Sequence, residues 1–223
     1  MKERLSEETI AMRVVKELND GDYVNLGVGI PQNCSLYIPA GKEIYFHAEQ
    51  GVIGYQRTLT REEWQEADLD YPDAGGRFIP SSAGMSVGDI VASFDMIIGG
   101  HLDCTVMGGL EVSENGDLAN WTYGARESGG IGGSMDLAVG AKKVIIAMTH
   151  TTKKGEPKIV KKCKLPLTAK ECVDLIVTDL ALIEVTPHGL LLKEYAPGWS
   201  VEEIQGLTEP QLIVSPDLKE MAL

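Results

Sequence analysis

The chain has 223 residues, of which 43% are hydrophobic and 24% charged, the ordinary balance of a globular protein with a buried core. It carries 33 acidic and 20 basic side chains, which gives a formal net charge of −13. Nucleic acids and anionic membrane surfaces attract proteins with basic patches, so this charge argues against both as partners.

Cysteine usage and the N-terminal sequence indicate a cytoplasmic location. None of the four cysteines lies in a C-x-x-C motif, and a chain of this length needs no disulfide framework. The sequence begins "MKERLSEETI", which is charged from the second residue, so we expect no signal peptide. No stretch approaches the roughly 18 uninterrupted apolar residues of a membrane span.

The first predicted element is a helix over residues 5–21. Ser6 is suited to its N-cap, apolar residues recur at every fourth position, and Gly21 suits its end. A short strand follows in "YVNLGVGIPQ", and Pro31 is placed to begin a second helix. The segment "EIYFH", at 43–47, predicts another strand because it is rich in β-formers.

The middle of the chain has a less regular pattern. We expect turns and excursions over residues 57–95, and strands with turns over "FDMIIGGHLDCTVMGGLEV" at 94–112. Residues 127–150 predict a glycine loop, then a helix, then the buried strand "KVIIAM". The tail adds further strands and a short helix that starts with the Ser200–Glu203 capping box.

This alternation of short apolar strands and helices predicts the fold class. We expect an α/β fold with an open, mainly parallel sheet and helices on both of its faces. The composition does not change along the chain and no internal repeat is present, so residues 1–223 are predicted to form a single domain.

Two glutamates are candidates for chemistry, and both precede a glycine by two positions. Glu114 lies in "SENGD", where Asn-Gly predicts a tight hairpin turn with two positive φ angles, so its side chain is expected at a solvated turn tip. Glu49 lies between the apolar runs "IYF" and "GVIG", at the carboxyl end of a predicted strand, where open α/β sheets bind ligands. We therefore favour Glu49, although glutamates in such loops are more often solvated surface residues.

Two glycine segments open predicted helices. "GVGIPQ" at 27–32 and "GGIGGSMD" at 129–136 would present unpaired backbone N–H groups to an anion or a developing oxyanion. Neither matches a dinucleotide or P-loop fingerprint, and each could be a simple turn. Among other candidates, "HLDC" at 101–104 lacks the spacing of a metal site, and His47 is more often a packed histidine. The lysine run at 153–164 could meet phosphates, but a solvated loop is the simpler interpretation.

Four long segments follow one another along the chain: "VNLGVGIPQ", "GGHLDCTVMGGLEVSENGDLANW", "GGIGGSMDLAVGAKKVIIAMTHTTKKGEPKIVKKCKLPLT" and "IVSPDL". In this order they resemble the B (β) subunit of family I CoA-transferases, of the 3-oxoacid and butyrate–acetoacetate type. The resemblance implies the NagB/RpiA/CoA-transferase-like fold. It also implies that CoA moves between a short-chain acyl-CoA and a carboxylic acid, by ping-pong kinetics through a glutamyl-CoA thioester.

The family's nucleophile is the glutamate of an S-E-N-G motif in the first quarter of the β subunit. The aligned stretch here is "AEQG", so the role passes to Glu49, and the literal "SENG" at 113–116 falls elsewhere in the family's pattern. Ala48 and Gln50 replace the family's serine and asparagine, which puts the hydrogen bonding around the nucleophile in doubt.

The resemblance also assigns the other groups of the site. It implies that Gly132 and Gly133 supply oxyanion N–H groups, and that Gly27 and Gly29 line the CoA site beside Glu49. It requires no cofactor and no metal, since coenzyme A is a substrate. It implies a CoA-transferase α subunit as partner, in an α2β2 or larger assembly.

Three other functions remain open at this point. An acyl-CoA hydrolase on the same scaffold would pass the acyl group to water. A non-catalytic structural subunit would carry an "AEQG" that no longer reacts. A sugar-phosphate isomerase with a related sheet ranks last, because no sugar-phosphate motif accompanies the long CoA-transferase match.

Overall fold

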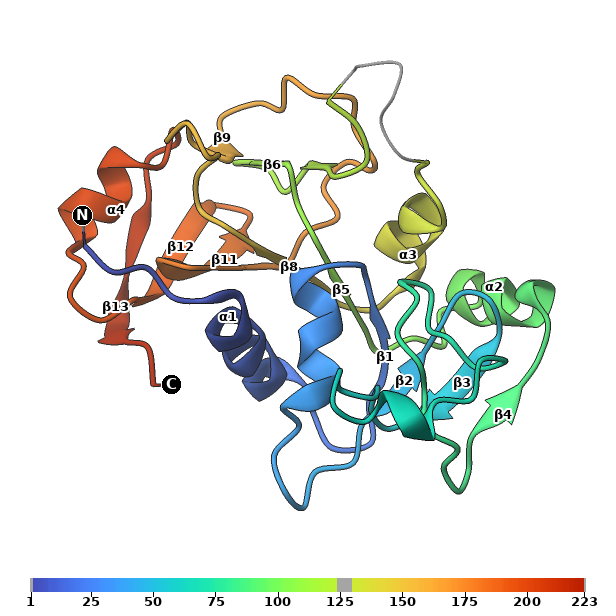
Figure 1. The fold of residues 1–223 in the computed structure, drawn as a ribbon. Coiled ribbons are helices and arrows are strands. Elements are labelled where there is room, and N and C mark those ends of the chain that lie inside the picture. Colours follow the sequence, from blue (N-terminus) through green and yellow to red (C-terminus); the bar gives the residue numbers. More distant parts are fainter. Residues whose placement is uncertain (1, 124–129, 223) are drawn as a thin grey trace.

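A single ten-stranded sheet runs through the molecule in the computed structural model, which describes residues 2–123 and 130–222 (Figure 1). Its strand order is β13-β12-β11-β10-β8-β5-β1-β2-β3-β4. Five neighbouring strands at its centre are parallel: β10 (Leu175–Thr178), β8 (Val144–Met148), β5 (Cys104–Met107), β1 (Tyr23–Leu26) and β2 (Tyr45–His47).

Strands of mixed direction flank this parallel centre. On one side, β3 and β4 pair antiparallel, and on the other β11 and β12 do so, before β13 pairs parallel with β12. Their bounds are β3 Val52–Tyr55, β4 Ser86–Val87, β11 Ala181–Thr186, β12 Gly189–Tyr195 and β13 Ile213–Glu220. A separate three-stranded sheet contains β6 (Glu111–Ser113), β7 (Leu118–Ala119) and β9 (Ile159–Val160).

Helices cover both faces of the sheet, as predicted. They are α1 (Glu7–Val14), α2 (Ile90–Ile98), α3 (Ser134–Gly140) and α4 (Val201–Gly206), with 3-10 helices at Val15–Glu17, Ile30–Leu36 and Trp64–Glu66. Alternate side chains of β8 show the two layers: Ile145 packs in the core with α1, whereas Ile146 packs in the core with α2 and α3. The open α/β fold class is therefore confirmed.

The predicted helix starts are more accurate than the predicted ends. The Ser6 hydroxyl accepts from the N–H of Thr9 at 3.2 Å and caps α1 as expected, but the helix tightens to 3-10 geometry after Val14 and ends well before Gly21. Pro31 lies in the first turn of a 3-10 helix, which is not the α-helix that the sequence predicted. The Ser200 capping box at α4 is confirmed.

Helix α2 contradicts the prediction for the middle of the chain. Residues 94–98 belong to this helix, which Asp89 caps by accepting from the N–H of Ala92 at 2.9 Å. Its sequence, "IVASFDMII", is apolar nearly all round, so it shows no helical stripe that would distinguish it from a buried strand. Much of it is exposed, including Ile90, Val91 and Ile98.

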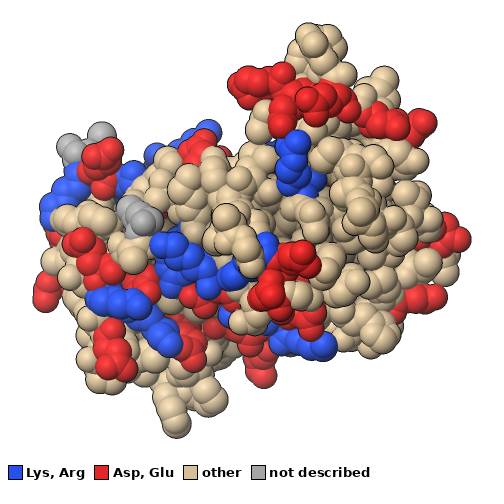
Figure 2. All heavy atoms as spheres, turned by 90° about the horizontal axis from the view of Figure 1, so that it is seen from below, with Lys and Arg blue, Asp and Glu red and all other residues tan. Residues whose placement is uncertain are grey.

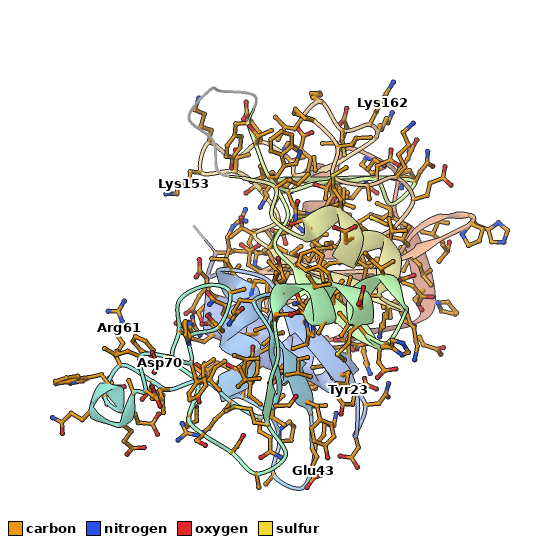
Figure 3. The ribbon with its side chains drawn as sticks, turned by 90° about the vertical axis from the view of Figure 1, so that its right-hand side faces the viewer. Tyr23, Glu43, Arg61, Asp70, Lys153 and Lys162 are labelled. Atoms are coloured by element: carbon orange, nitrogen blue, oxygen red, sulfur yellow. The ribbon has the colours of Figure 1, made fainter. Side chains whose placement is uncertain are left out.

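The expected excursion projects from the sheet between β3 and β4. Arg61 and Asp70 lie on it, away from the main body (Figure 3). Seen from below, acidic side chains gather on the projecting part of the molecule (Figure 2). The excursion holds only one 3-10 turn, and Trp64 in that turn is exposed. No helix in the described parts of the chain is long and apolar enough to cross a membrane.

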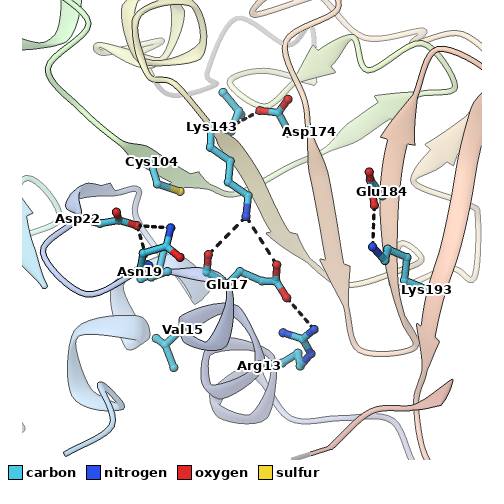
Figure 4. A network of polar contacts seen from close by, with 12 residues as sticks. Arg13, Val15, Glu17, Asn19, Asp22, Cys104, Lys143, Asp174, Glu184 and Lys193 are labelled. Carbon is cyan, nitrogen blue, oxygen red and sulfur yellow. Dashed lines mark hydrogen bonds and ion pairs between the residues drawn. The ribbon is translucent and has the colours of Figure 1, made fainter. Parts of the chain in front are cut away.

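A network of charged side chains ties α1 to strands from the second half of the chain (Figure 4). Arg13 is buried and donates to Glu194 at 2.6 Å and to Glu17 at 2.8 Å, while Lys143 lies 3.6 Å from Glu17. A buried guanidinium depends on such partners, because breaking one side of a buried ion pair leaves an uncompensated charge. This network holds α1 to the strands from the second half of the chain. It lies apart from the residues described next.

Candidate active site

Glu49 lies in the tight turn that joins β2 to β3, at the carboxyl end of a parallel strand. The N–H of Ala48 donates to the carbonyl of Val52 and that of Gly51 to the carbonyl of Ala48, both at 2.9 Å. The turn projects its single carboxylate beyond the sheet edge, where open α/β sheets form their ligand crevice. The position predicted from the sequence is confirmed.

The two glycines after Glu49 let a neighbouring backbone segment pass close to the turn. A Cβ on Gly51, where φ is +116°, would lie 2.2 Å from the carbonyl oxygen of Gly88, and one on Gly54 would lie 3.2 Å from that of Gly84. The segment that leads into α2 therefore occupies this space. Glycine is required so that two backbones can pass each other.

The Glu49 carboxylate reaches the start of α3. The backbone N–H of Gly133 donates to its Oε2 at 3.0 Å. A Cβ on Gly133 would lie 2.6 Å from the same oxygen and 2.9 Å from Cζ of Phe94 on α2. Only glycine therefore lets the N–H approach the carboxylate, and residues 84 positions apart in the sequence form one unit.

Burial raises the pKa of the Glu49 carboxyl above its ordinary value. The Gly133 N–H opposes this by stabilising the anion, and the negative charge of Asp136 in the first turn of α3 adds to the increase in pKa. The carboxylate is thus partly desolvated yet held by a directed donor. This is the environment expected of a nucleophile that must be ionised and reactive.

A cavity of about 300 Å³ contains the Glu49 side chain. It is lined by Leu26, Gly27, Val28, Glu49, Ala74, Met107, Gly108, Asn120, Ser134, Leu137 and residues 130–133. Three of the four predicted glycines, Gly27, Gly132 and Gly133, are therefore at the cavity. Gly129, from the same predicted loop, lies outside the described residues.

Gly29 does not line the cavity around Glu49, and its role at the CoA site stays a prediction. Gly29 adopts φ +93° to turn the chain from β1 into the next 3-10 helix, and it is not in the cavity wall. Its N–H donates instead to the Gln32 side chain at 3.2 Å, which uses the donor that was expected to face an anion.

A buried polar network supports the turn that contains Glu49. His47 bonds through Nε2 to the Ser93 hydroxyl at 2.8 Å, and Asn25 donates to the His47 carbonyl at 3.2 Å. The Ser93 hydroxyl also lies 3.2 Å from the carbonyl of Ala48. Burial lowers the pKa of His47, which favours its neutral form. His47 is thus a packed and hydrogen-bonded histidine, the simpler of the two interpretations.

Asn120 lines the cavity, although no pattern in the sequence predicts a role for it. Its Oδ1 accepts from the Thr168 hydroxyl at 2.6 Å, so the donating end of the amide is not used in this bond. The sequence "LANW" carried only a family signal at this position, because a lone asparagine after a strand has no recognisable spacing pattern.

Glu114 is not part of this cavity. It lies in the hairpin turn between β6 and β7, as expected, and it is half-exposed. The turn type differs from the prediction, because only Gly116 has a positive φ, +83°, and its N–H donates to the carbonyl of Ser113 at 3.0 Å. A three-residue loop whose αL position is glycine replaces the expected two-residue turn.

Part of the lysine run borders a second cavity, of about 560 Å³. Lys153 and Lys158 line it together with Arg4, and Gly108 belongs to the walls of both cavities. Burial lowers the pKa of Lys158 to about 8. The run is therefore not simply a solvated loop, since part of it lies beside the Glu49 site.

Comparisons with known proteins identify the family of this chain. The profile of the family described as Coenzyme A transferase matches residues 7–206. The chain is 44% identical over 218 residues to the beta subunit of acetate CoA-transferase from Haemophilus influenzae, covering 98% of this chain and 96% of the relative. It is 43% identical to the corresponding subunit of 3-oxoadipate CoA-transferase from Acinetobacter baylyi, covering 94% and 96%.

Solved structures share the fold at lower identity. Glutaconate coenzyme A-transferase from Acidaminococcus fermentans superposes with a TM-score of 0.75 at 16% identity, covering 98% of this chain and 89% of that one. An acyl-CoA transferase of Escherichia coli gives a TM-score of 0.78 at 22% identity, and this chain spans 44% of its length. The decarboxylase AibA/AibB gives 0.70 at 17% identity, with coverage of 99% and 90%, so the fold alone does not fix the reaction.

The family profile and the near-complete relatives place this chain in the coenzyme A transferase family. Within that family it is the β subunit of a CoA-transferase enzyme, which implies an α subunit as its partner.

Proposed function

We propose that the protein moves CoA between a short-chain acyl-CoA and a carboxylic acid, with Glu49 as the covalent nucleophile. The observation that carries the proposal is the hydrogen bond of 3.0 Å between the Gly133 N–H and Glu49 Oε2 at the wall of a small cavity. No general base is needed, because a glutamate is already ionised near neutral pH.

In the first half-reaction a Glu49 oxygen attacks the thioester carbonyl, and the C–S bond breaks to release CoA as a thiolate. The thiolate then attacks the Glu49 carbonyl of the resulting acyl-glutamyl anhydride. This step forms the glutamyl-CoA thioester and expels the first carboxylate. A second carboxylate reverses the two steps and leaves as its CoA ester, which restores the Glu49 carboxylate.

The Gly133 N–H has two tasks in this sequence. It orients the free carboxylate, and it donates to the same oxygen when negative charge develops there during thiolate attack on the Glu49 carbonyl. Gly132 and Asn120 also line the cavity, where further donors would stabilise the other oxyanion. Apolar walls of Leu26, Met107 and Leu137 limit access of water, which would hydrolyse the thioester.

The small cavity and the relatives support short-chain substrates. A volume of about 300 Å³ is at the lower end for ligand pockets and suits a short acyl group next to the thioester. The named relatives act on acetate and 3-oxoadipate. We propose acids of this size as donor and acceptor. The basic second cavity, which shares Gly108 with the first, is suited to the CoA phosphates.

An α subunit is proposed to complete the site, in an α2β2 or larger assembly. Apolar side chains are exposed side by side on the packed helices α2 and α3, among them Ile90, Val91 and Val139, whose exposed fractions are 57%, 64% and 78%. Exposed apolar patches of this kind mark protein interfaces. Because α3 begins with the glycines that hold Glu49, a partner on this face would lie next to the cavity.

Peptide mass spectrometry tests the covalent step. The chain is co-purified with its α subunit, mixed with short-chain acyl-CoAs without acceptor, and digested. We expect a CoA-sized adduct on the peptide that contains Glu49, and its loss when acceptor acid is added. Glu49→Gln should give no adduct, and the matched variant Glu114→Gln should label normally.

Other outcomes identify the alternatives. Steady release of free CoA without adduct would indicate a hydrolase, and no reaction in the presence of the α subunit would indicate a non-catalytic subunit. An adduct on Glu114 would overturn the choice of nucleophile.

A further inference from the structure

Gln50, which directly follows the nucleophile, turns its side chain away from the cavity. Its amide Nε2 donates to the backbone carbonyl of Pro72 in the excursion between β3 and β4. The turn that carries Glu49 is thus fastened to a segment more than 20 residues further along the chain. An asparagine here, as in the family that the sequence resembles, is one methylene shorter.

A second connection reaches the same segment from the other side. The carboxylate of Asp73 is buried and accepts from Gln32 Nε2 at 2.9 Å and 3.1 Å, one distance to each oxygen. It also accepts from the N–H groups of Gly75 at 2.9 Å and Arg77 at 2.7 Å. Gln32 in turn accepts from the N–H of Gly29, so the segment is linked to the glycine turn after β1.

The segment packs tightly where these connections meet. A Cβ on Gly75 would lie 2.0 Å from Gln32 Nε2, so the chain passes directly over that side chain. Ala74 directly follows the two connected residues, Pro72 and Asp73, and it is the one residue of the excursion in the cavity wall around Glu49. It is itself exposed, which places it at the cavity mouth.

We propose that residues 72–77 form the wall that limits the length of the acyl group, with Ala74 as the residue that sets the size. Gln50 and Asp73 are positioning residues that hold this wall against the nucleophile turn. The ligand class is a short acyl chain, because the wall is fixed by hydrogen bonds at Pro72 and Asp73 and presents one methyl group to a small cavity. The inference rests on the proposed transferase function.

The test measures kcat/KM of the complex with its α subunit for acetyl-, butyryl- and hexanoyl-CoA. Ala74→Leu should lower the hexanoyl-to-acetyl ratio by about tenfold or more, since one methylene in an apolar pocket changes discrimination by about that factor. Ala74→Gly removes a methyl group from the wall and cannot overfill the cavity, so it should raise the hexanoyl-to-acetyl ratio. Ala83→Leu is the matched control: Ala83 is exposed in the same excursion and outside the cavity wall, so the ratio should stay within about twofold.

The positioning role has its own variant. Gln50→Asn should raise the hexanoyl-to-acetyl ratio while retaining the glutamyl-CoA adduct, because the wall loses one connection and the nucleophile keeps its donor. A merely structural role would lower activity toward the three substrates equally.

Two results would overturn the inference. In one, the ratio is unchanged in the Ala74 variants. In the other, all three acyl-CoAs lose activity equally through KM, which would assign the wall to the CoA arm. Failure of the proposed function is seen separately, as a wild-type complex that forms no adduct and transfers no CoA.

Discussion

The turns that contain Glu49 and Glu114 have nearly the same sequence, "AEQG" and "SENG", and different surroundings. Each follows a strand, and each places a positive-φ glycine two residues after the glutamate, Gly51 at φ +116° and Gly116 at φ +83°. The two turns differ in which distant segments of the chain pack against them. At Glu49 the start of α3 brings the Gly133 N–H to 3.0 Å from the carboxylate oxygen Oε2, whereas Glu114 lies in a hairpin of the small sheet.

The topology of the sheet around a glutamate, more than its local sequence motif, decides which groups its carboxylate can contact. Strand β2 belongs to the parallel centre, so its carboxyl end faces the loops that precede α2 and α3. Strand β6 turns back on itself within three residues, and no helix among the described residues begins beside that turn. Two similar tetrapeptides thus differ in hydrogen bonding and in expected reactivity.

The largest expected effect contrasts the two glutamates directly. Glu49→Gln removes the nucleophile and should lower kcat by a factor on the order of 10⁴ or more, as expected when a covalent group is lost. Glu114→Gln should stay within about twofold, since Glu114 lies outside the cavity and substitutions away from such sites change little. Steady-state transfer assays on the complex measure both. Equal losses in the two variants would contradict the comparison.

The next effect concerns the donor that distinguishes the two turns. Gly133→Ala would place a methyl group 2.6 Å from Glu49 Oε2, displacing the carboxylate from its N–H. We expect kcat to fall by about 10²- to 10³-fold, the usual cost of losing one oxyanion donor. Gly206→Ala is the control, because a Cβ at Gly206 meets no atom within 4 Å and its φ is not positive. A Gly133→Ala enzyme with normal kcat would contradict this role.

At the second turn we expect a cost in stability with no cost in catalysis. Gly116→Ala combines a φ of +83° with a Cβ 3.1 Å from the carbonyl oxygen of Val173, so unfolding free energy should drop by about 1–3 kcal/mol. Gly21→Ala has the same φ and no atom within 4 Å, and should cost less. Urea denaturation measures both values. Reduced activity per folded molecule in Gly116→Ala would give this turn a catalytic role.

The smallest effect is a change in pH dependence. Burial, and secondly Asp136, raise the pKa of Glu49, so kcat/KM should fall on acidification at a higher pH than for an ordinary glutamate. Asp136→Asn removes the like charge, lowers that pKa and should move the acid limb of the profile to lower pH. Asp95→Asn, an exposed change on α2, should leave it in place. An acid limb that moves upward in Asp136→Asn would reverse the sign.

The sequence predicted those features whose cause is local. Ser6 and Ser200 began helices because their caps act within four residues, and apolar runs such as "KVIIAM" marked the buried strands. Helix α2 was missed because its apolar face is not limited to one side. Within the candidate site, Glu49 was accessible to reasoning from its flanking residues, and so was the general role of the glycine loop.

The remainder of the site depends on contacts between distant segments. The free donor expected at Gly29 is bonded to Gln32, and Gln32 reaches Asp73 in the excursion. Asn120 and Ala74 meet at the cavity from two unrelated loops. No periodicity or motif in the sequence encodes these contacts, because they form only once the order of the strands in the sheet is established.

The ion pairs of α1 have a consequence for how the chain is made. Glu194 holds this first helix through Arg13 at 2.6 Å, and Asp179 holds the segment just before it through Arg4 at 2.9 Å. On the ribosome these partners are absent until most of the chain has been synthesised, and non-local contacts form late. Until β12 has been synthesised, Arg13 can pair with Glu17, four residues away, but lacks its buried partner Glu194. A nascent chain that stalls before Glu194 lacks the buried ion pair that holds its first helix.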